Sequence, residues 1–188
     1  MLEKMMKKKD MLADIERVLV SEEELSARIK EVAAQISRDY AGKCPILVGV
    51  LNGVVPFYAA MTQSITIPLI VDFMSVKSYE GTSSTGILNI RKDLDHDIEG
   101  RDVLILEDIL DSGRTLSYLV ELFQARNPRS VKICTMLDKP EGRTENLEAD
   151  YVCFNVPNAF VVGMGLDYEG YYRNLPFVGV LKPHVYQD

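Results

Sequence analysis

The sequence predicts an α/β protein whose central, mostly parallel sheet carries helices on both faces. Two observations support this prediction. Short runs of branched and aliphatic residues, typical of strands buried on both faces, alternate along the chain with segments whose apolar residues recur at helical spacing. Polar residues follow four of these runs, and ligands of parallel sheets bind beyond the carboxyl ends of the strands. These polar residues are Asn52 and Gly53, Glu107 and Asp108, Asp138 and Lys139, and Asp167.

Composition and charge limit the functions that the chain can have. Its 188 residues are enough for one domain with a real core, and we see no linker that would divide two domains. The net charge of −7 argues against a nucleic-acid-binding protein. The three cysteines favour reduced thiols in the cytoplasm over a disulfide framework. The apolar runs are too short to span a membrane, and we expect the basic N-terminus to be a frayed or helical leader, not a secretory signal.

The first predicted helix begins after Ser21. Ser21 and Glu24 have the spacing of a capping box, in which each side chain accepts a hydrogen bond from the backbone of the other residue. Apolar residues at helical spacing continue to about Arg38, and Gly42 is a typical stop signal.

Two strand and helix units follow. Residues 45–51 form an apolar run, and residues 54–63 can form a helix because Pro56 falls in its first turn. We predict further strands at 69–76 and 87–91. A ten-residue polar, glycine-rich loop separates these two, so we expect them to pair antiparallel.

Residues 103–116 read V-L-I-L-E-D-I-L-D-S-G-R-T-L and organise the rest of the chain. The first four residues predict a buried strand, at whose end Glu107 and Asp108 stand side by side. Residues 111–115 predict a small polar loop. Apolar residues at helical spacing follow from Leu116 onward, so the stretch predicts a strand, a loop and a helix.

The last third of the chain alternates short strands with loops. We predict strands at 130–137, 151–155, 160–162 and 177–181, with a polar loop at 141–149.

The loop at 111–115 is suited to a phosphate monoester. The start of a helix leaves free backbone N–H groups, and Ser112 and Thr115 add hydroxyl donors. Glu107 and Asp108 repel phosphate, but they can accept hydrogen bonds from the two vicinal hydroxyls of a ribose. The stretch therefore fits a sugar 5-phosphate, although an ordinary buried strand that ends in solvated acids is the alternative.

This stretch resembles the binding motif for 5-phosphoribosyl-1-pyrophosphate (PRPP) of the type I phosphoribosyltransferases, and within them the hypoxanthine-guanine branch. The resemblance runs from about Val18 to Val180. It implies a mostly parallel sheet with a core at roughly 40–165 and a small hood from the terminal segments. It also implies a Mg²⁺-dependent purine salvage enzyme that transfers the phosphoribosyl group of PRPP to N9 of hypoxanthine or guanine, giving IMP or GMP and pyrophosphate. Relatives are dimers or tetramers, so a homo-oligomer is expected, and neither a nucleic acid nor a membrane is expected as a partner.

The resemblance assigns residues to each part of PRPP. The binding motif contributes Glu107, Asp108, Asp111, Ser112, Gly113, Arg114 and Thr115. Pyrophosphate is expected on Leu51, Asn52 and Gly53, with a cis peptide between the first two, and on Arg173. Many relatives carry lysine where this chain has Asn52. The Mg²⁺ ion is expected near Asp167, with Glu107 and Asp108 as further acidic groups.

The resemblance also assigns the reacting groups. Ser78 and Tyr79 fall in a loop that closes over the reaction centre and excludes water. Asp111 is expected to act as acid or base at N7 of the purine, with a simple helix N-cap as the alternative reading.

The base itself is expected to contact four residues. Lys139 would donate to O6 of a 6-oxopurine, Phe160 would stack on the ring, the backbone of Val161 would accept from the ring, and Asp167 lies nearby. A solvated surface charge is the alternative for Lys139, and a core aromatic for Phe160. Two rival functions stay open, a same-fold enzyme that prefers xanthine and a regulator that binds PRPP without catalysis. The sequence leaves open the preferred base, the oligomeric state and the role of the leader.

Overall fold

The computed structural model describes residues 8–78 and 88–187. Its centre is a six-stranded sheet in the order β4-β3-β2-β5-β6-β7. Every neighbouring pair is parallel except β3 and β4, which pair antiparallel as the sequence predicts. The strands in sheet order are β4 (Leu88–Lys92), β3 (Ile70–Ser78), β2 (Ile46–Leu51), β5 (Asp102–Leu110), β6 (Ser130–Asp138) and β7 (Tyr151–Asn155).

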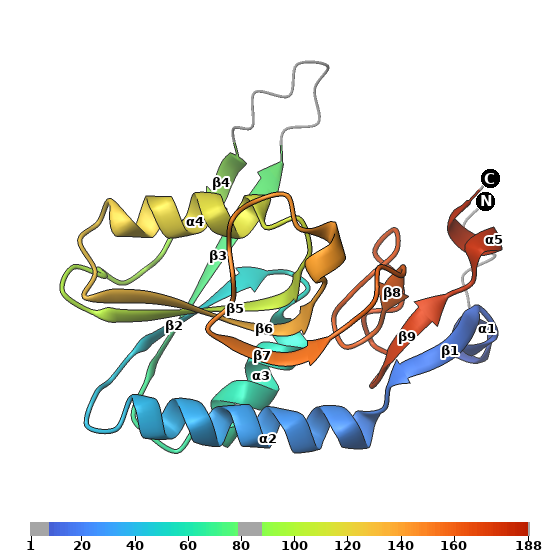
Figure 1. The fold of residues 1–188 in the computed structure, drawn as a ribbon, viewed down its shortest axis with the longest axis horizontal. Coiled ribbons are helices and arrows are strands. Elements are labelled where there is room, and N and C mark those ends of the chain that lie inside the picture. The colour runs from blue at the N-terminus through green and yellow to red at the C-terminus, as the bar shows by residue number, and fades with distance from the viewer. Residues whose placement is uncertain (1–7, 79–87, 188) are drawn as a thin grey trace.

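Helices cover both faces of this sheet, so the predicted α/β class is confirmed (Figure 1). Helices α2 (Glu22–Asp39) and α3 (Val55–Ser64) lie below the sheet, and α4 (Arg114–Gln124) lies above it. Two hydrophobic clusters match this arrangement, because one contains the buried residues of α2 and α3 and the other those of α4. Within the described part of the chain, no helix is both long and apolar enough to cross a membrane.

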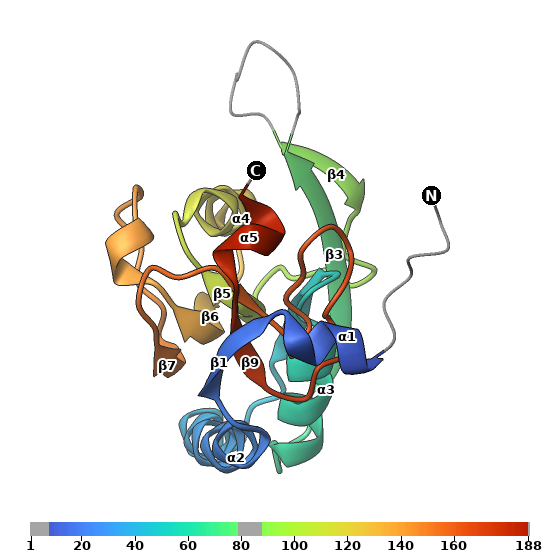
Figure 2. The same ribbon diagram turned by 90° about the vertical axis from the view of Figure 1, so that its right-hand side faces the viewer.

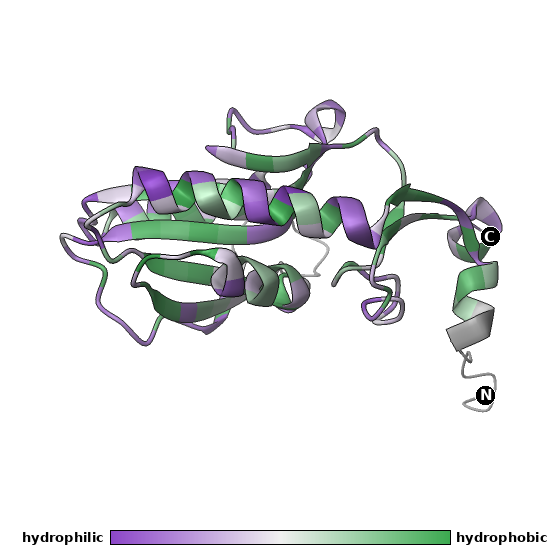
Figure 3. Ribbon diagram, turned by 90° about the horizontal axis from the view of Figure 1, so that it is seen from below, coloured by the Kyte–Doolittle hydropathy of each residue, from purple (hydrophilic) through white to green (hydrophobic). Residues whose placement is uncertain are grey.

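Local sequence explains where α2 begins and which way it faces. Ser21 Oγ accepts from the Glu24 N–H at 3.2 Å, and Glu24 Oε2 accepts from the Ser21 N–H at 2.8 Å, so the predicted capping box is present. The buried face carries Leu25, Ile29 and Ile36, whereas polar residues cover the opposite face, as the alternating colours of Figure 3 show.

A second, three-stranded antiparallel sheet, in the order β1-β9-β8, joins the two ends of the chain. It contains β1 (Ile15–Val20), β9 (Val178–Leu181) and β8 (Val161–Val162). Helices α1 (Lys8–Ala13) and α5 (Pro183–Tyr186) lie together at one end of it (Figure 2). This sheet corresponds to the expected hood, and it shares a hydrophobic cluster with the large sheet through Val20, Val178 and Leu104.

The structure differs from the sequence prediction in one strand that was missed and in two element boundaries. Strand β1 was not predicted, because its only partner in the sheet is β9 at the other end of the chain. Strand β5 runs to Leu110, so Glu107 and Asp108 lie inside the strand and not beyond it. Helix α4 begins at Arg114, so this residue and Thr115 belong to its first turn instead of the loop.

Candidate active site

Two adjoining pockets lie where β2 and β5 end. The first, which we call the loop pocket, has a volume of about 170 Å³ and lies between the end of β5 and the start of α4. The second, the rim pocket, has a volume of about 320 Å³ and lies between the ends of β2 and β5. Glu107, Asp108 and Thr115 line both pockets, so these side chains form the boundary between them. The loop pocket is completed by Ile109, Leu110, Asp111, Ser112, Gly113 and Leu116, and the rim pocket by Val50, Leu51, Asn52, Gly53, Val76, Asp167 and Arg173.

The start of α4 leaves its backbone donors free for a ligand. Gly113 is the N-cap residue, with φ of 85°, a left-handed conformation that glycine adopts without steric cost. No side chain caps the helix, so the alternative reading of Asp111 as the helix cap is wrong. The first-turn N–H groups lie beside Ser112 and Thr115 on the pocket wall, an arrangement that can bind an anion.

Arg143 holds this loop in place, and the sequence analysis missed it. Its Nε donates to the Asp111 carbonyl oxygen at 2.9 Å, and its other nitrogens donate to the Asp138 carboxylate and the Leu147 carbonyl. The N–H groups of the next two residues both donate to the Ser112 carbonyl, at 3.0 and 3.1 Å. The predicted polar loop at 141–149 therefore supports the loop at 111–115, which we call the phosphate loop. No local pattern in the sequence indicates this supporting role.

The acidic pair is held in a poorly solvated position. Glu107 Oε2 is buried and has no hydrogen-bond partner among the described residues. Burial, and then the neighbouring Asp108, raise the pKa of Glu107 well above its usual value. Burial also raises the pKa of Asp108, although Arg173 opposes that rise. Asp108 Oδ1 accepts from the Ile109 N–H at 2.8 Å, but Glu107 Oε2 lacks a donor, and a ribose hydroxyl would supply one.

The turn after β2 lets the backbone approach the acidic pair. The Leu51–Asn52 peptide bond is cis, as the resemblance implies. A Cβ atom at Gly53 would lie 1.7 Å from Asp108 Oδ2, so any other residue there would have to displace the Asp108 carboxylate.

Asp167 and Arg173 form an ion pair on the far wall of the rim pocket. Arg173 Nη2 lies 2.8 Å from Asp167 Oδ1, and Arg173 Nη1 donates to the Gly165 carbonyl oxygen at 2.6 Å. The Gly170 N–H donates to Asp167 Oδ2 at 2.7 Å. These contacts hold a guanidinium group at the pocket that the resemblance assigns to pyrophosphate.

Lys139 is not a solvated surface charge. It is only 7% exposed, and its backbone N–H donates to the Leu110 carbonyl oxygen at 2.9 Å. Its Nζ lies 3.7 Å from Asp111 Oδ2, whose side chain is half-exposed. The structure thus brings together two residues that the resemblance assigns to the base.

Of the remaining residues assigned to the base, Asp167 lines the rim pocket, whereas Phe160 and Val161 line neither pocket. Phe160 stacks on Tyr186 of α5, with ring centroids 4.6 Å apart, and meets Tyr168 edge-on at 5.7 Å. Val161 is buried in β8. Ser78 is the last residue of β3, and Tyr79 lies outside the described residues.

Known proteins are similar to this chain over nearly its whole length. Residues 19–169 match the family described as phosphoribosyl transferase domain. The hypoxanthine-guanine phosphoribosyltransferase of Bacillus subtilis is 54% identical over 176 residues, which cover 93% of this chain and 98% of that protein. Its counterpart in Streptococcus mutans is 55% identical over 174 residues, 92% of this chain and 97% of that protein.

The fold is also similar to that of a solved structure. The crystal structure of a hypoxanthine phosphoribosyltransferase from Staphylococcus aureus superposes with a TM-score of 0.91 at 47% identity. The alignment covers 95% of this chain and 97% of that one. Sequence and fold therefore agree over nearly the whole length, and the chain belongs to the hypoxanthine-guanine phosphoribosyltransferase family.

Proposed function

We propose that the chain is a purine salvage enzyme that transfers the 5-phosphoribosyl group of PRPP to N9 of hypoxanthine or guanine, giving IMP or GMP and pyrophosphate. One observation carries this proposal. The two pockets adjoin through Glu107 and Asp108, so a helix N-terminus and an arginine lie on either side of two hydrogen-bond acceptors. PRPP has the same order of groups, with a 5-phosphate, a ribose diol and a pyrophosphate.

Each group of the site has a task in this reaction. The first-turn N–H groups of α4, with the hydroxyls of Ser112 and Thr115, bind the 5-phosphate. Glu107 and Asp108 accept from the ribose hydroxyls, and Arg173 neutralises charge on the leaving pyrophosphate. The site then holds N9 of the base opposite the leaving pyrophosphate at the ribose, and this alignment lowers the barrier to the transfer.

Asp111 and Lys139 act on the base. O6 and N7 lie on one edge of a 6-oxopurine and both accept hydrogen bonds. Lys139 donates to O6, while Asp111 holds or moves a proton at N7 as N9 forms its bond to the ribose. Phe160 and the backbone of Val161 complete the base site, and the segment at Ser78 and Tyr79 closes over it to exclude water.

Mg²⁺ is the proposed cofactor. Among residues 8–78 and 88–187, no group of three or more His, Cys, Asp or Glu side chains gathers into a metal site. Mg²⁺ bound to substrate phosphates needs only one or two carboxylates, and Asp167, Glu107 and Asp108 line the rim pocket. The donor set therefore fits an ion that arrives with PRPP, where it would neutralise the charge of the pyrophosphate.

We further propose a cytoplasmic homo-oligomer, a dimer or tetramer, in which residues 1–188 act as one domain. The core would span roughly 40–165, with the hood from the terminal segments. The hydrophobic cluster shared by both sheets supports one domain. The free thiols of Cys44, Cys134 and Cys153 are typical of the cytoplasm, and exposed Val55 and Val71 are suitable contacts for a second copy.

A pyrophosphate-release assay with four bases tests the proposed function. Hypoxanthine and guanine should both support release when PRPP and Mg²⁺ are present, and adenine should not. Release with xanthine alone would favour the same-fold rival. If PRPP binds but no base supports release, the chain is a regulator and the enzymatic proposal is wrong.

A further inference from the structure

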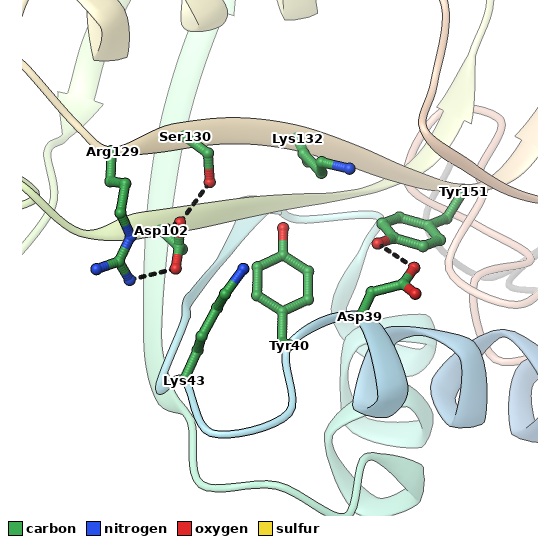
Figure 4. Close-up of a pocket in the computed structure, with 8 residues that line it drawn as sticks. All are labelled: Asp39, Tyr40, Lys43, Asp102, Arg129, Ser130, Lys132 and Tyr151. Carbon is green, nitrogen blue, oxygen red and sulfur yellow. Dashed lines mark hydrogen bonds and ion pairs between the residues drawn. The ribbon is translucent and has the colours of Figure 1, made fainter.

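A further cavity, separate from the loop pocket and the rim pocket, lies at the opposite end of the large sheet from the candidate active site. It has a volume of about 460 Å³ and lies at the amino ends of β5 and β6, next to the end of α2 (Figure 4). Asp102 begins β5 at this cavity, whereas Glu107 lies near the other end of the same strand. The lining residues are Asp39, Tyr40, Lys43, Asp102, Arg129, Ser130, Lys132 and Tyr151.

Tyr40 places an unused donor in this cavity. The residue is only 3% exposed, and its hydroxyl oxygen is buried with no hydrogen-bond partner among the described residues. Figure 4 shows the hydroxyl pointing into the cavity, toward Ser130 and Lys132. Burial, followed by the charges of Asp102, Asp150 and Asp39, raises the pKa of Tyr40 to about 12, with the Ser130 hydroxyl opposing the rise. The hydroxyl therefore keeps its proton at neutral pH and needs an acceptor.

The carboxylates of this region already have partners. Asp102 accepts from Arg129 Nε at 3.0 Å and from Ser130 Oγ at 2.7 Å. Asp39 accepts from the Tyr151 hydroxyl at 2.9 Å. Asp150, just outside the cavity, accepts from the Ile133 N–H at 2.9 Å.

Two lysines add further donors to this cavity. Lys43 Nζ lies 5.4 Å from the centre of the Tyr40 ring and forms no ion pair within the described part of the chain. Lys132 Nζ lies 5.8 Å from the centre of the Tyr151 ring and 3.7 Å from Asp150 Oδ1. Two ammonium groups and an unpartnered hydroxyl thus face one cavity, a donor set that suits an anion and not a metal cation.

We propose that this cavity is a second phosphate-binding site, in which the Tyr40 hydroxyl, Lys43 and Lys132 bind free phosphate or a phosphate monoester. Phosphate offers several strong acceptor oxygens to the three donors. The volume leaves room for an esterified group as well, since a water molecule takes up about 30 Å³. A single water could satisfy the hydroxyl, but it would bring no negative charge to Lys43, which has no ion-pair partner among the described residues.

Phosphate binding is best measured in a chain whose loop pocket is closed to anions. Thr115→Asp puts a carboxylate into the loop pocket, and an acidic residue in the first turn of α4 favours the helix. Inorganic phosphate and ribose 5-phosphate are titrated calorimetrically into this variant, and we expect one equivalent to bind. Tighter binding of ribose 5-phosphate identifies a monoester site, and binding of inorganic phosphate alone identifies a free-phosphate site.

Substitutions in the cavity then locate the bound phosphate. Adding Tyr40→Phe, Lys43→Gln or Lys132→Gln should each weaken binding about tenfold or more, because the first removes a hydroxyl donor and the other two each remove a positive charge that faces the phosphate. Tyr151→Phe is the matched control, since its hydroxyl is already bound to Asp39, and it should leave the affinity unchanged. No binding to the Thr115→Asp chain, or equal affinity in its Tyr40→Phe form, overturns the proposal. If Thr115→Asp does not fold, the unaltered chain should show a phosphate-binding event whose affinity the Tyr40→Phe substitution lowers about tenfold or more, and affinities that Tyr40→Phe leaves unchanged overturn the proposal.

Discussion

Lys139 Nζ lies 3.7 Å from Asp111 Oδ2, although the two residues come from different strand ends. Asp111 follows β5 and Lys139 follows β6, and the parallel pairing of these strands brings their carboxyl ends together. Their charged groups can therefore face one edge of a purine at the same time. This pair connects the phosphate loop to the proposed base site.

Asp111→Asn should abolish most turnover without unfolding the chain. The amide keeps the shape of the carboxyl but cannot take or give a proton at N7, so kcat should fall by about 10²- to 10⁴-fold. Asp111 does not cap α4, so the melting temperature should change little. Steady-state kinetics and thermal unfolding of the same preparation measure both quantities. Unchanged kcat would remove Asp111 from the reaction.

Arg143→Lys should weaken PRPP binding although Arg143 lines neither pocket. Lysine keeps the charge but cannot contact the Asp111 carbonyl, Asp138 and the Leu147 carbonyl together. Losing one hydrogen bond to a charged group costs about 1.5–3 kcal/mol, so the KM for PRPP should rise roughly 10-fold or more. Arg126→Lys is the matched control, because Arg126 pairs with Asp93 away from the site. Equal kinetics for the two variants would show that Arg143 does not position the loop.

Glu107→Gln should change how stability depends on pH. Burial raises the pKa of Glu107, so the folded chain holds a proton that the unfolded chain releases above about pH 4.3. The free energy of unfolding should therefore fall as pH rises from about 5 to 7, and a glutamine at this position should lessen that fall. Urea unfolding at both pH values measures it, with the exposed Glu99→Gln as control. The same decline in all three chains would contradict the raised pKa.

Asp167→Ala should raise the Mg²⁺ and PRPP requirements more than it changes the KM for hypoxanthine. The substitution removes a carboxylate from the rim pocket and leaves Arg173 without its partner. A chelator should abolish the activity of the parent chain, and added Mg²⁺ should restore it. Kinetics over a range of Mg²⁺ concentrations make the comparison, and full activity of the variant at low Mg²⁺ would place the ion elsewhere.

Local patterns in the sequence were enough for the phosphate loop and most of the large sheet. The capping box at Ser21 and the stretch from Val103 to Leu116 depend on neighbouring residues, so the sequence alone predicts them. The end of β5 was placed too early because apolar character stops at Leu106. Backbone pairing with β6 continues past that point, to Leu110 and Asp138, since a strand beside a pocket can carry polar side chains.

Features that depend on distant parts of the chain could not be predicted. Strand β1 pairs with β9, the last strand of the chain, so no neighbouring residues signal it. Arg143 lies in a loop without periodicity, and its role follows from contacts to Asp111 and Asp138. The position of Phe160 could not be predicted either, because it depends on a contact with Tyr186 in the C-terminal helix α5.

The ratio of kcat/KM for hypoxanthine to that for adenine, measured in the parent chain and in Lys139→Ala, tests the central claim most directly. Lys139 has only donors, so it pairs with the carbonyl at position 6 of hypoxanthine and not with the amino group of adenine. Its loss should lower hypoxanthine turnover by about 10- to 200-fold and narrow the ratio. Phe160→Ala is the control, because a ring face serves any purine, so it should weaken both bases and leave the ratio nearly unchanged. An unchanged ratio in Lys139→Ala would contradict the assignment of this site to a 6-oxopurine.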